Sequence, residues 1–141
     1  MRLFTGFLCA LSLAAFSVAQ AAEPPKTSAE PRHTEHPGEV ALIQSGNEFA
    51  YKHFPTNLAL YYYDKDTPTA SACNGECSYA WPPVTAPISA KPLGDWTLVR
   101  RTDTRDQWAY KGKPVYVRFH DSVEKPSGEG ADGGAWHVLK P

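Results

Sequence analysis

Apolar and polar positions alternate along this chain in short runs that turn signals interrupt. Between residues 58 and 63 both alternating faces are apolar or aromatic, which is typical of a strand covered on both sides. Runs elsewhere end at turn signals such as Ser45-Gly46-Asn47. Beyond the first 21 residues no window has a convincing helical period, although a short helical turn fits residues 78–81. The pattern predicts an all-β fold with strands at 40–44, 48–52, 58–63, 96–101, 107–110, 115–119 and 135–139.

One aromatic and acidic stretch occurs twice. Three pairs recur at one step: Tyr61 and Tyr116 (116 − 61 = 55), Asp66 and Asp121 (121 − 66 = 55), and Trp81 and Trp136 (136 − 81 = 55). Upstream, residues 49–52 resemble residues 108–111, and the first copy has four extra residues before its tyrosine. We therefore predict a single compact domain at 38–141 built from two tandem repeats with a period of about 55 residues. Repeat one covers 38–86 and repeat two covers 94–141; each has three or four short strands, and both share one core.

The N-terminal segment has the features of a signal peptide. Arg2 supplies a positive start, residues 3–18 form an apolar run, and Ala19-Gln20-Ala21 supplies small residues for cleavage. We predict a signal peptide at 1–21 that is cleaved near Ala21 or Ala22. Cys9 lies at the front of the apolar run, without the small preceding residue of a lipidation site. We expect a periplasmic or secreted protein with no stable membrane anchor in the mature chain.

Charge and composition argue against one class of function and identify a linker. The chain has 14 basic and 15 acidic residues, so loss of Arg2 leaves 13 − 15 = −2. The absence of a basic patch argues against nucleic-acid binding. Residues 22–37 are rich in Pro, Glu, Lys, Ser, Thr and His, which predicts a disordered linker.

Two cysteines remain after cleavage, Cys73 and Cys77. In an oxidising compartment such a pair is expected to form a disulfide, and a loop this short gains about 2 kcal/mol from it. Repeat two has Gly128 and Asp132 at the equivalent positions, so we interpret the bridge as a local feature. The alternative is a copper site in which both cysteines act as thiolates. His120 or His137 would complete that site.

Several motifs together resemble a known family. Tyr61, Tyr63 and Asp66 fit the motif Tyr-x-(aromatic)-x-x-Asp, which the secreted-repeat lipoprotein family carries in tandem. The other matching motifs are Cys73-x-x-x-Cys77, Trp81-Pro82-Pro83, residues 108–114 and residues 134–138. The resemblance implies an exported bacterial protein of a family without a settled biochemical function or catalytic residues. Two features depart from the family pattern: the missing lipidation site, and Arg118 in place of the middle aromatic of repeat two.

The repeated tyrosines, aspartates and tryptophans have a structural and a functional interpretation. Within each repeat, we expect the aspartate to accept a hydrogen bond from the tyrosine hydroxyl or from loop amides, which pairs Tyr61 with Asp66 and Tyr116 with Asp121. The functional alternative is a pair of polar sites in a ligand groove, with Tyr63 as a further motif residue. The tryptophans, Trp81 and Trp136 among them, are expected to pack in the core; the alternative is a platform for a flat ligand.

These observations leave three functional hypotheses. We favour a non-enzymatic β-scaffold of the bacterial envelope, without a cofactor, that binds an envelope protein or a small ligand. The second hypothesis is a periplasmic copper or redox accessory protein using the two cysteines and a histidine. The third is a hydrolase using Asp121, Asp132 and His137, although the chain has no G-x-S-x-G or H-E-x-x-H motif.

Overall fold

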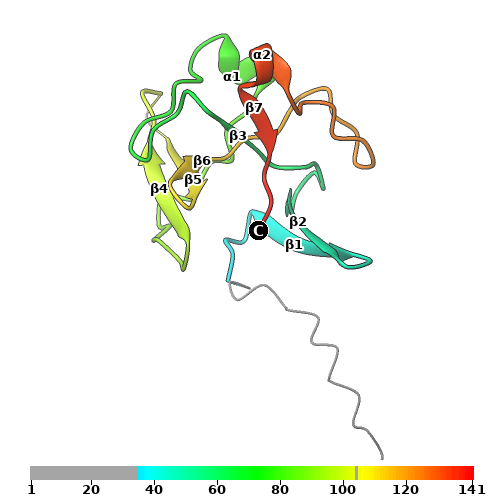
Figure 1. Cartoon of the computed structure of the whole chain (residues 1–141). Helices are drawn as coiled ribbons and strands as arrows, with labels where there is room; N and C mark the ends of the chain where they lie inside the picture. Colours follow the sequence, from blue (N-terminus) through cyan, green and yellow to red (C-terminus); the bar gives the residue numbers. More distant parts are fainter. Residues whose placement is uncertain (1–34, 104) are drawn as a thin grey trace, which may run out of the picture.

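Short antiparallel strands dominate the computed structural model, which describes residues 35–103 and 105–141 (Figure 1). The elements are β1 (Val40–Ser45), β2 (Glu48–His53), β3 (Tyr61–Tyr63), α1 (Cys77–Ala80), β4 (Trp96–Arg100), β5 (Asp106–Tyr110), β6 (Lys113–Pro114), α2 (Ala131–Gly134) and β7 (Trp136–Val138). The predicted all-β class is confirmed. The signal peptide predicted at 1–21 and residues 22–34 of the predicted linker lie outside the described residues.

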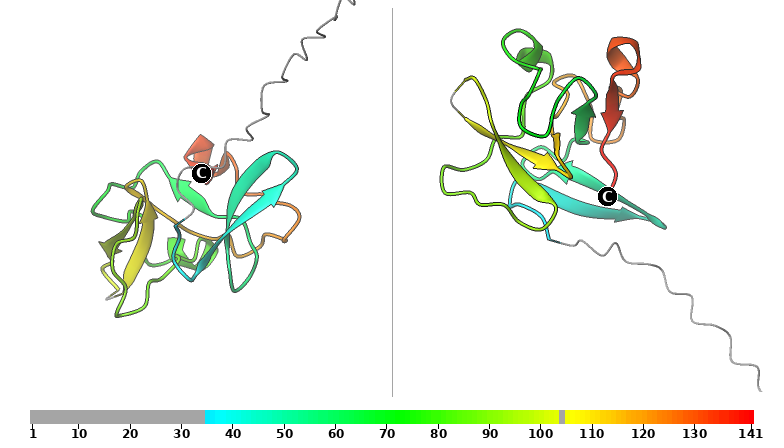
Figure 2. Two further views of the ribbon diagram at one scale, coloured as in Figure 1. Left: turned by 90° about the horizontal axis from the view of Figure 1, so that it is seen from below. Right: turned by 60° about the vertical axis from the view of Figure 1, so that its left-hand side comes forward.

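The strands form three small sheets. β1 and β2 make one hairpin in the first repeat, and β4, β5 and β6 make the matching sheet of the second repeat (Figure 2). Both tight turns need left-handed backbone: Gly46 has φ 60° after β1, and Lys111 and Gly112 have φ 48° and 74° after β5. The third sheet pairs β3 of the first repeat with β7 of the second, so the two repeats share backbone hydrogen bonds.

The repeats face each other around an approximate two-fold axis. The Tyr61 N–H donates to the Tyr116 carbonyl at 2.8 Å, and the Tyr116 N–H donates to the Tyr61 carbonyl at 2.9 Å. These tyrosines are equivalent in the two repeats, so the reciprocal pair lies where a symmetry axis would pass. The arrangement is that of a symmetric dimer whose two halves are joined in one chain.

Buried apolar side chains form two clusters rather than the one core that was predicted. Leu60 and Val115 belong to the first cluster, and the next residues, Tyr61 and Tyr116, belong to the second. Successive side chains of an extended segment point to opposite faces, so segments 60–61 and 115–116 are covered on both sides. The strand predicted at 115–119 is wrong, because this segment pairs only through isolated bridges at Tyr116. Each cluster takes residues from both repeats.

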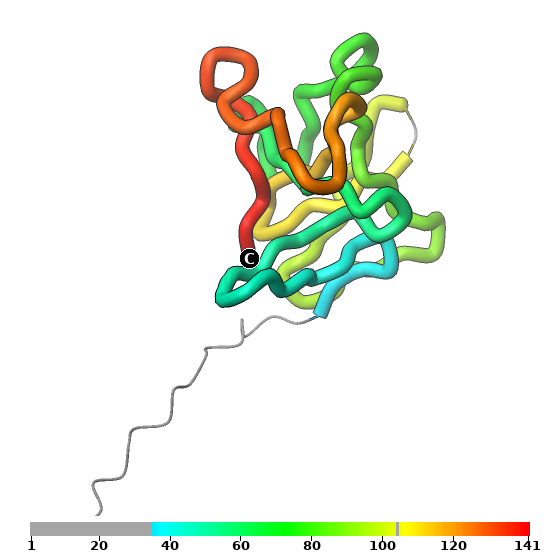
Figure 3. Tube along the Cα trace, turned by 90° about the vertical axis from the view of Figure 1, so that its right-hand side faces the viewer, coloured from blue at the N-terminus to red at the C-terminus, as the bar shows by residue number. Residues whose placement is uncertain are grey.

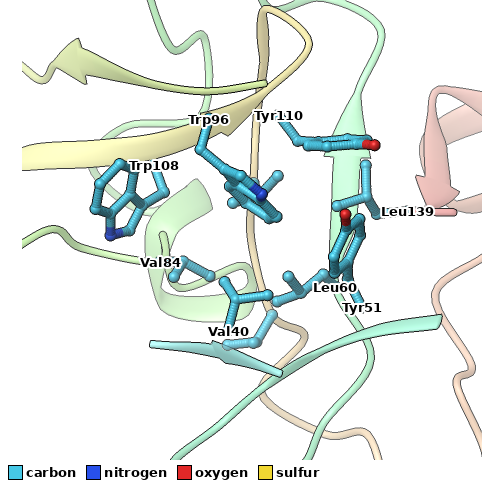
Figure 4. Packing of buried hydrophobic residues seen from close by; sticks show 10 residues of the cluster. Val40, Tyr51, Leu60, Val84, Trp96, Trp108, Tyr110 and Leu139 are labelled. Atoms are coloured by element: carbon cyan, nitrogen blue, oxygen red, sulfur yellow. The ribbon is translucent and has the colours of Figure 1, made fainter. Parts of the chain in front are cut away.

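The larger cluster is built on aromatic side chains (Figure 4). The Tyr51 ring meets Trp96 edge-on at 5.1 Å between ring centroids and meets Tyr110 at 5.0 Å. Edge-to-face pairs of this kind add to the stabilisation that comes from burial. Because Tyr51 lies in the first repeat and the other two rings in the second, this packing also holds the repeats together.

Three smaller features complete the fold. Residues 35–37 of the predicted linker are described, and the buried Pro37 accepts a hydrogen bond from the Val40 N–H at 3.0 Å. α1 lies where the sequence left room for a helical turn. α2 was not predicted, because its Asp132 and Gly133 have φ of 53° and 67° and form a left-handed turn. Among the described residues, no helix has the length and apolar character needed to cross a membrane.

Candidate functional site

The repeated tyrosines and aspartates pair between the repeats. The Tyr61 hydroxyl donates to Asp121 Oδ2 at 2.5 Å, and the Tyr116 hydroxyl donates to Asp66 Oδ2 at 2.8 Å. The predicted pairing within each repeat is therefore wrong. Both tyrosine rings lie in the smaller cluster, which the repeats share, so each hydroxyl reaches the loop of the other repeat.

Each aspartate also closes its own loop. Asp66 Oδ1 accepts the Ala72 N–H at 2.7 Å, and Asp121 Oδ1 accepts the Ser127 N–H at 3.0 Å. Both loops span the same six positions (72 − 66 = 6 and 127 − 121 = 6). The loop amides were therefore predicted correctly as donors. Each carboxylate fixes one loop to the tyrosine of the other repeat.

Burial raises the pKa values of both tyrosines and of Asp66. Burial, followed by the nearby carboxylate, raises the pKa of Tyr61 and Tyr116 well above the usual range of a phenol. Burial also raises the pKa of Asp66, against the lowering effect of the hydrogen bonds from Ala72 and Tyr116. The tyrosines thus remain protonated donors at neutral pH.

A four-layer stack crosses the boundary between the repeats. The Trp81 and Trp136 rings stack at 3.8 Å between centroids with planes 3° apart. Tyr63 stacks on the outer face of Trp136 at 4.3 Å, and the Arg118 guanidinium lies 5.4 Å from the Trp81 ring centroid. Arg118 occupies the position equivalent to Tyr63 (118 − 63 = 55), so a cation–π contact replaces an aromatic one there.

The two repeats differ in the loop beside this stack, where repeat one has Cys73 and repeat two has Gly128. Cys73 and Cys77 are joined by the predicted disulfide, with their Cα atoms 5.2 Å apart. At the position equivalent to Cys73, a Cβ on Gly128 would lie 2.5 Å from Trp81 Cη2 and 2.9 Å from Tyr61 Cε1. Repeat two needs glycine there because the loop contacts the rings directly.

An apolar groove of about 500 Å³ lies between β2 and the C-terminal segment 138–141; we call it the β2 groove. In Figures 1 and 3 the chain descends from β7 and ends beside the β1–β2 hairpin. The groove-lining residues are Ile43, Ser45, Glu48, Phe49, Ala50, Lys52, Val138, Leu139, Lys140 and Pro141. A smaller hollow of about 240 Å³ shares residues 138–140 with it and adds Lys111 and Lys113.

Comparison with known proteins identifies the family. A family model described as a secreted repeat of unknown function matches residues 56–85 and 97–140, one segment in each repeat. The chain belongs to this secreted-repeat family. The match confirms the two predicted repeats, and the family's description as secreted agrees with a location outside the cytoplasm. No curated protein and no solved structure matches the chain.

In this member of the secreted-repeat family, the residues proposed as copper ligands are bonded to other groups. The bridge removes the Cys73 and Cys77 thiolates. His137 lies between two carboxylates, Nε2 at 2.9 Å from Asp64 Oδ2 and Nδ1 at 3.1 Å from Glu129 Oε1, and these bonds raise its pKa. Within 35–103 and 105–141, no three His, Cys, Asp or Glu side chains are grouped so as to hold a metal ion.

His120, the other proposed histidine ligand, contacts the Phe119 ring at 5.0 Å between centroids. The hydrolase residues are likewise engaged separately. Asp132 accepts the Tyr63 hydroxyl at 2.6 Å and Lys65 Nζ at 2.9 Å, whereas Asp121 holds Tyr61. The described hydrogen bonds link none of Asp121, Asp132 and His137 to another of the three.

Sequence reasoning missed the β2 groove. Apart from Val138, its lining lies outside the motifs identified in the sequence, and it depends on where residues 138–141 run in space. The sequence match of Phe49 to Trp108 gave no signal, because the strand registers place Tyr51 at the position of Trp108: Tyr51 lies opposite Leu42 and Trp108 lies opposite Leu98.

Proposed function

We propose that this secreted-repeat protein is a non-enzymatic binding scaffold of the bacterial envelope, and that the β2 groove is its binding face. The proposal is supported by how the motif residues are used. The tyrosines, aspartates and tryptophans of both repeats hold the repeats together, and the cysteines are bridged. The β2 groove is an open concave surface outside this framework.

The lining of the β2 groove fits a ligand that is apolar and carries negative charge. Ile43, Phe49 and Leu139 supply apolar surface, and most ligand-binding sites are lined mainly by such side chains. Lys140 is the lining cation without a hydrogen bond or ion pair among the described residues, whereas Lys52 Nζ donates to the Val123 carbonyl at 2.8 Å, and Glu48 is the acidic side chain. A partner protein or a small ligand that presents apolar groups beside carboxylates matches this lining.

The first test maps where an apolar anion binds. We would titrate the protein with anilinonaphthalenesulfonate and follow backbone amide shifts by NMR. The expected shifts are at Phe49, Ala50 and Leu139. Replacement Ala50→Glu places a negative charge in the groove and should abolish them, while unchanged thermal unfolding shows that the variant is folded.

The control is Phe119→Ala, outside the groove. Phe119 is 66% exposed and Tyr79 is 79% exposed, so they offer the dye an alternative surface. Shifts at the groove should persist in this variant. Shifts confined to Tyr79 and Phe119 would overturn the assignment of the binding face.

The second test addresses the metal alternative. We would compare native and denatured intact masses of protein purified from the periplasm without chelator. The expected masses are equal, and both are two hydrogens below the mass of the reduced chain, because Cys73 and Cys77 are bridged. A metal mass lost on denaturation, together with free thiols, would move the copper hypothesis to first place.

A further inference from the structure

The β2 groove adjoins a second cavity along the C-terminal segment. This cavity of about 240 Å³, which we call the lysine hollow, is lined by Tyr62, Tyr110, Lys111, Lys113 and residues 138–140. Residues 138–140 line the β2 groove as well, so the two cavities meet along one stretch of chain. The groove lining is mainly apolar, whereas the hollow gathers three lysines. A ligand that reaches from one to the other would meet apolar side chains at one end and positive charge at the other.

Aromatic rings hold two of the ammonium groups at the lysine hollow. Lys113 Nζ lies 3.7 Å from the Tyr62 ring centroid, and Lys111 Nζ lies 4.7 Å from the Tyr110 ring centroid. Such contacts are favourable because the face of an aromatic ring carries partial negative charge. Both lysines flank the tight turn at Gly112 that joins β5 to β6. The turn and the two rings therefore place positive charge beside an aromatic lining.

The three lysines of the hollow have little anionic compensation. Lys111 Nζ is 4.0 Å from Asp95 Oδ2, the limit of an ion pair. Within 35–103 and 105–141, neither Lys113 nor Lys140 forms an ion pair. No acidic side chain of these ranges lines the hollow. Like charges gathered at one concave surface repel one another and attract an anion, which relieves that repulsion.

We infer that the β2 groove and the lysine hollow together bind a single-chain lipid with a phosphate headgroup, its alkyl chain in the groove and its phosphate at the hollow. This inference rests on the proposed function and names the class of its ligand. The groove volume of about 500 Å³ is within the usual range of ligand pockets. Glu48 lines the groove and not the hollow, so it disfavours the anionic end there and orients the ligand.

Phosphate fits the hollow better than a carboxylate does. A lysine ammonium binds phosphate as a point charge, without the fixed geometry that an arginine imposes. A phosphate monoester carries a charge of about −1.5 to −2 at neutral pH, whereas a carboxylate carries a single charge. Three cations around one hollow therefore favour the phosphate ester.

The probe is decyl phosphate, used below the concentration at which it forms micelles. Decyl maltoside is the matched uncharged ligand with the same alkyl chain, and backbone amide shifts are followed by NMR. We expect decyl phosphate to shift the amides of Phe49 and Ala50 in the groove and of Lys111 and Lys113 in the hollow. Decyl maltoside should shift the groove amides only and bind more weakly. Inorganic phosphate should shift neither set at the same concentration, because it lacks the chain.

Removal of two lysines isolates the headgroup contact. Lys113→Gln combined with Lys140→Gln removes two cations of the hollow and keeps the apolar groove. Lys91→Gln, at an exposed lysine outside both cavities, is the control. Surface ion pairs are individually weak, so the loss of two should weaken decyl phosphate binding by about tenfold. Decyl maltoside binding should stay unchanged in both variants, and thermal unfolding checks that they are folded.

Salt provides the same comparison on the unaltered protein if the lysine variant does not fold. Raised ionic strength screens charges at the surface, so it should weaken decyl phosphate binding relative to decyl maltoside binding. Equal responses of the two ligands to salt would contradict a charged headgroup contact.

Three further results would overturn the lipid assignment. The first is decyl phosphate binding that the lysine variant leaves unchanged or weakens no more than decyl maltoside binding. The second is decyl phosphate that shifts the groove but leaves residues 111–113 unshifted. The third is shifts that appear only above the micelle concentration or only with vesicles of anionic phospholipid, which would mean adsorption to an aggregate or a membrane surface. If anilinonaphthalenesulfonate still maps to the groove in these cases, the proposed function stands without a phosphate site. If no probe shifts the groove amides, both proposals fail.

Discussion

Removal of one tyrosine hydroxyl measures the bond that crosses between the repeats. Tyr61→Phe keeps the ring against Trp81, where the centroids are 5.3 Å apart, and removes the donor to Asp121. A hydrogen bond to a charged group contributes about 1.5–3 kcal/mol. The hydroxyl also accepts the buried Gly128 N–H at 3.2 Å, which then loses its partner. We therefore expect a loss near the upper end of that range.

The double-mutant cycle tests the crossing itself. Asp121→Ala is combined with Tyr61→Phe, and Asp66→Ala with Tyr61→Phe serves as the matched control from the same repeat as Tyr61. Residues that share a bond show a coupling energy of about 0.5–3 kcal/mol, and independent residues add within about 0.5 kcal/mol. We expect clear coupling with Asp121 and near-additivity with Asp66.

The assay is urea unfolding at neutral pH with the disulfide intact, followed by tryptophan fluorescence. Trp81 and Trp136 lie beside the altered bonds and report on the transition. A larger coupling of Tyr61 with Asp66 than with Asp121 would refute the crossed arrangement. Equal couplings would refute the reasoning that assigns each hydroxyl to one carboxylate.

Three further predictions concern packing and pH. Gly128→Ala forces a Cβ against Trp81 and should cost about 1–3 kcal/mol in urea unfolding; Gly38→Ala, with open space around it, is the control, and equal effects would contradict the packing argument. Arg118→Tyr and Arg118→Ala both lose the hydrogen bonds from Arg118 to Ser127, but only the tyrosine keeps a stacking partner on Trp81, so Arg118→Ala should be less stable than Arg118→Tyr by about 0.5–1 kcal/mol; the reverse order would count against the stack. The pKa of His137 is raised above 6.5 by its two carboxylate partners, so its contribution is full below pH 6.5 and is lost as the pH rises through the folded pKa. His137→Gln should therefore destabilise the protein at pH 6 and have little effect at pH 9, and a larger effect at pH 9 would show that the sign is wrong.

The sequence predicted most of the strands, 115–119 excepted, and the two repeats, because both depend on spacing. Alternation over residues 58–63 marked the covered central strand, and the step of 55 marked the duplication. The sequence did not predict that each tyrosine bonds to the aspartate of the other repeat. A tyrosine has the same offset from the aspartate of its own repeat in both copies, and spacing does not say which carboxylate its hydroxyl reaches. The backbone pairing of Tyr61 with Tyr116 determines which carboxylate each hydroxyl reaches, because it sets the two repeats against each other.

The remaining differences have local physical causes. The left-handed turn of α2 has no periodic signal, because glycines and Asp132 with positive φ define it. The β2 groove depends on the path of residues 138–141, whose sequence match to 83–86 suggests pairing with the neighbouring strand. Pro141 lacks the N–H that its sequence match Ala86 donates to Asp106, a difference that the alignment alone does not bring out.

Sharing of bonds between the repeats has a consequence for secretion. A chain that crosses a membrane starting from its N-terminus exposes repeat one before repeat two arrives. At that stage Tyr61 has no Asp121, Trp81 has no Trp136, and β3 has no β7 to pair with. The domain therefore closes only when its last strand has crossed. Until then the emerging half presents unpaired strand edges and exposed aromatic rings to chaperones and proteases.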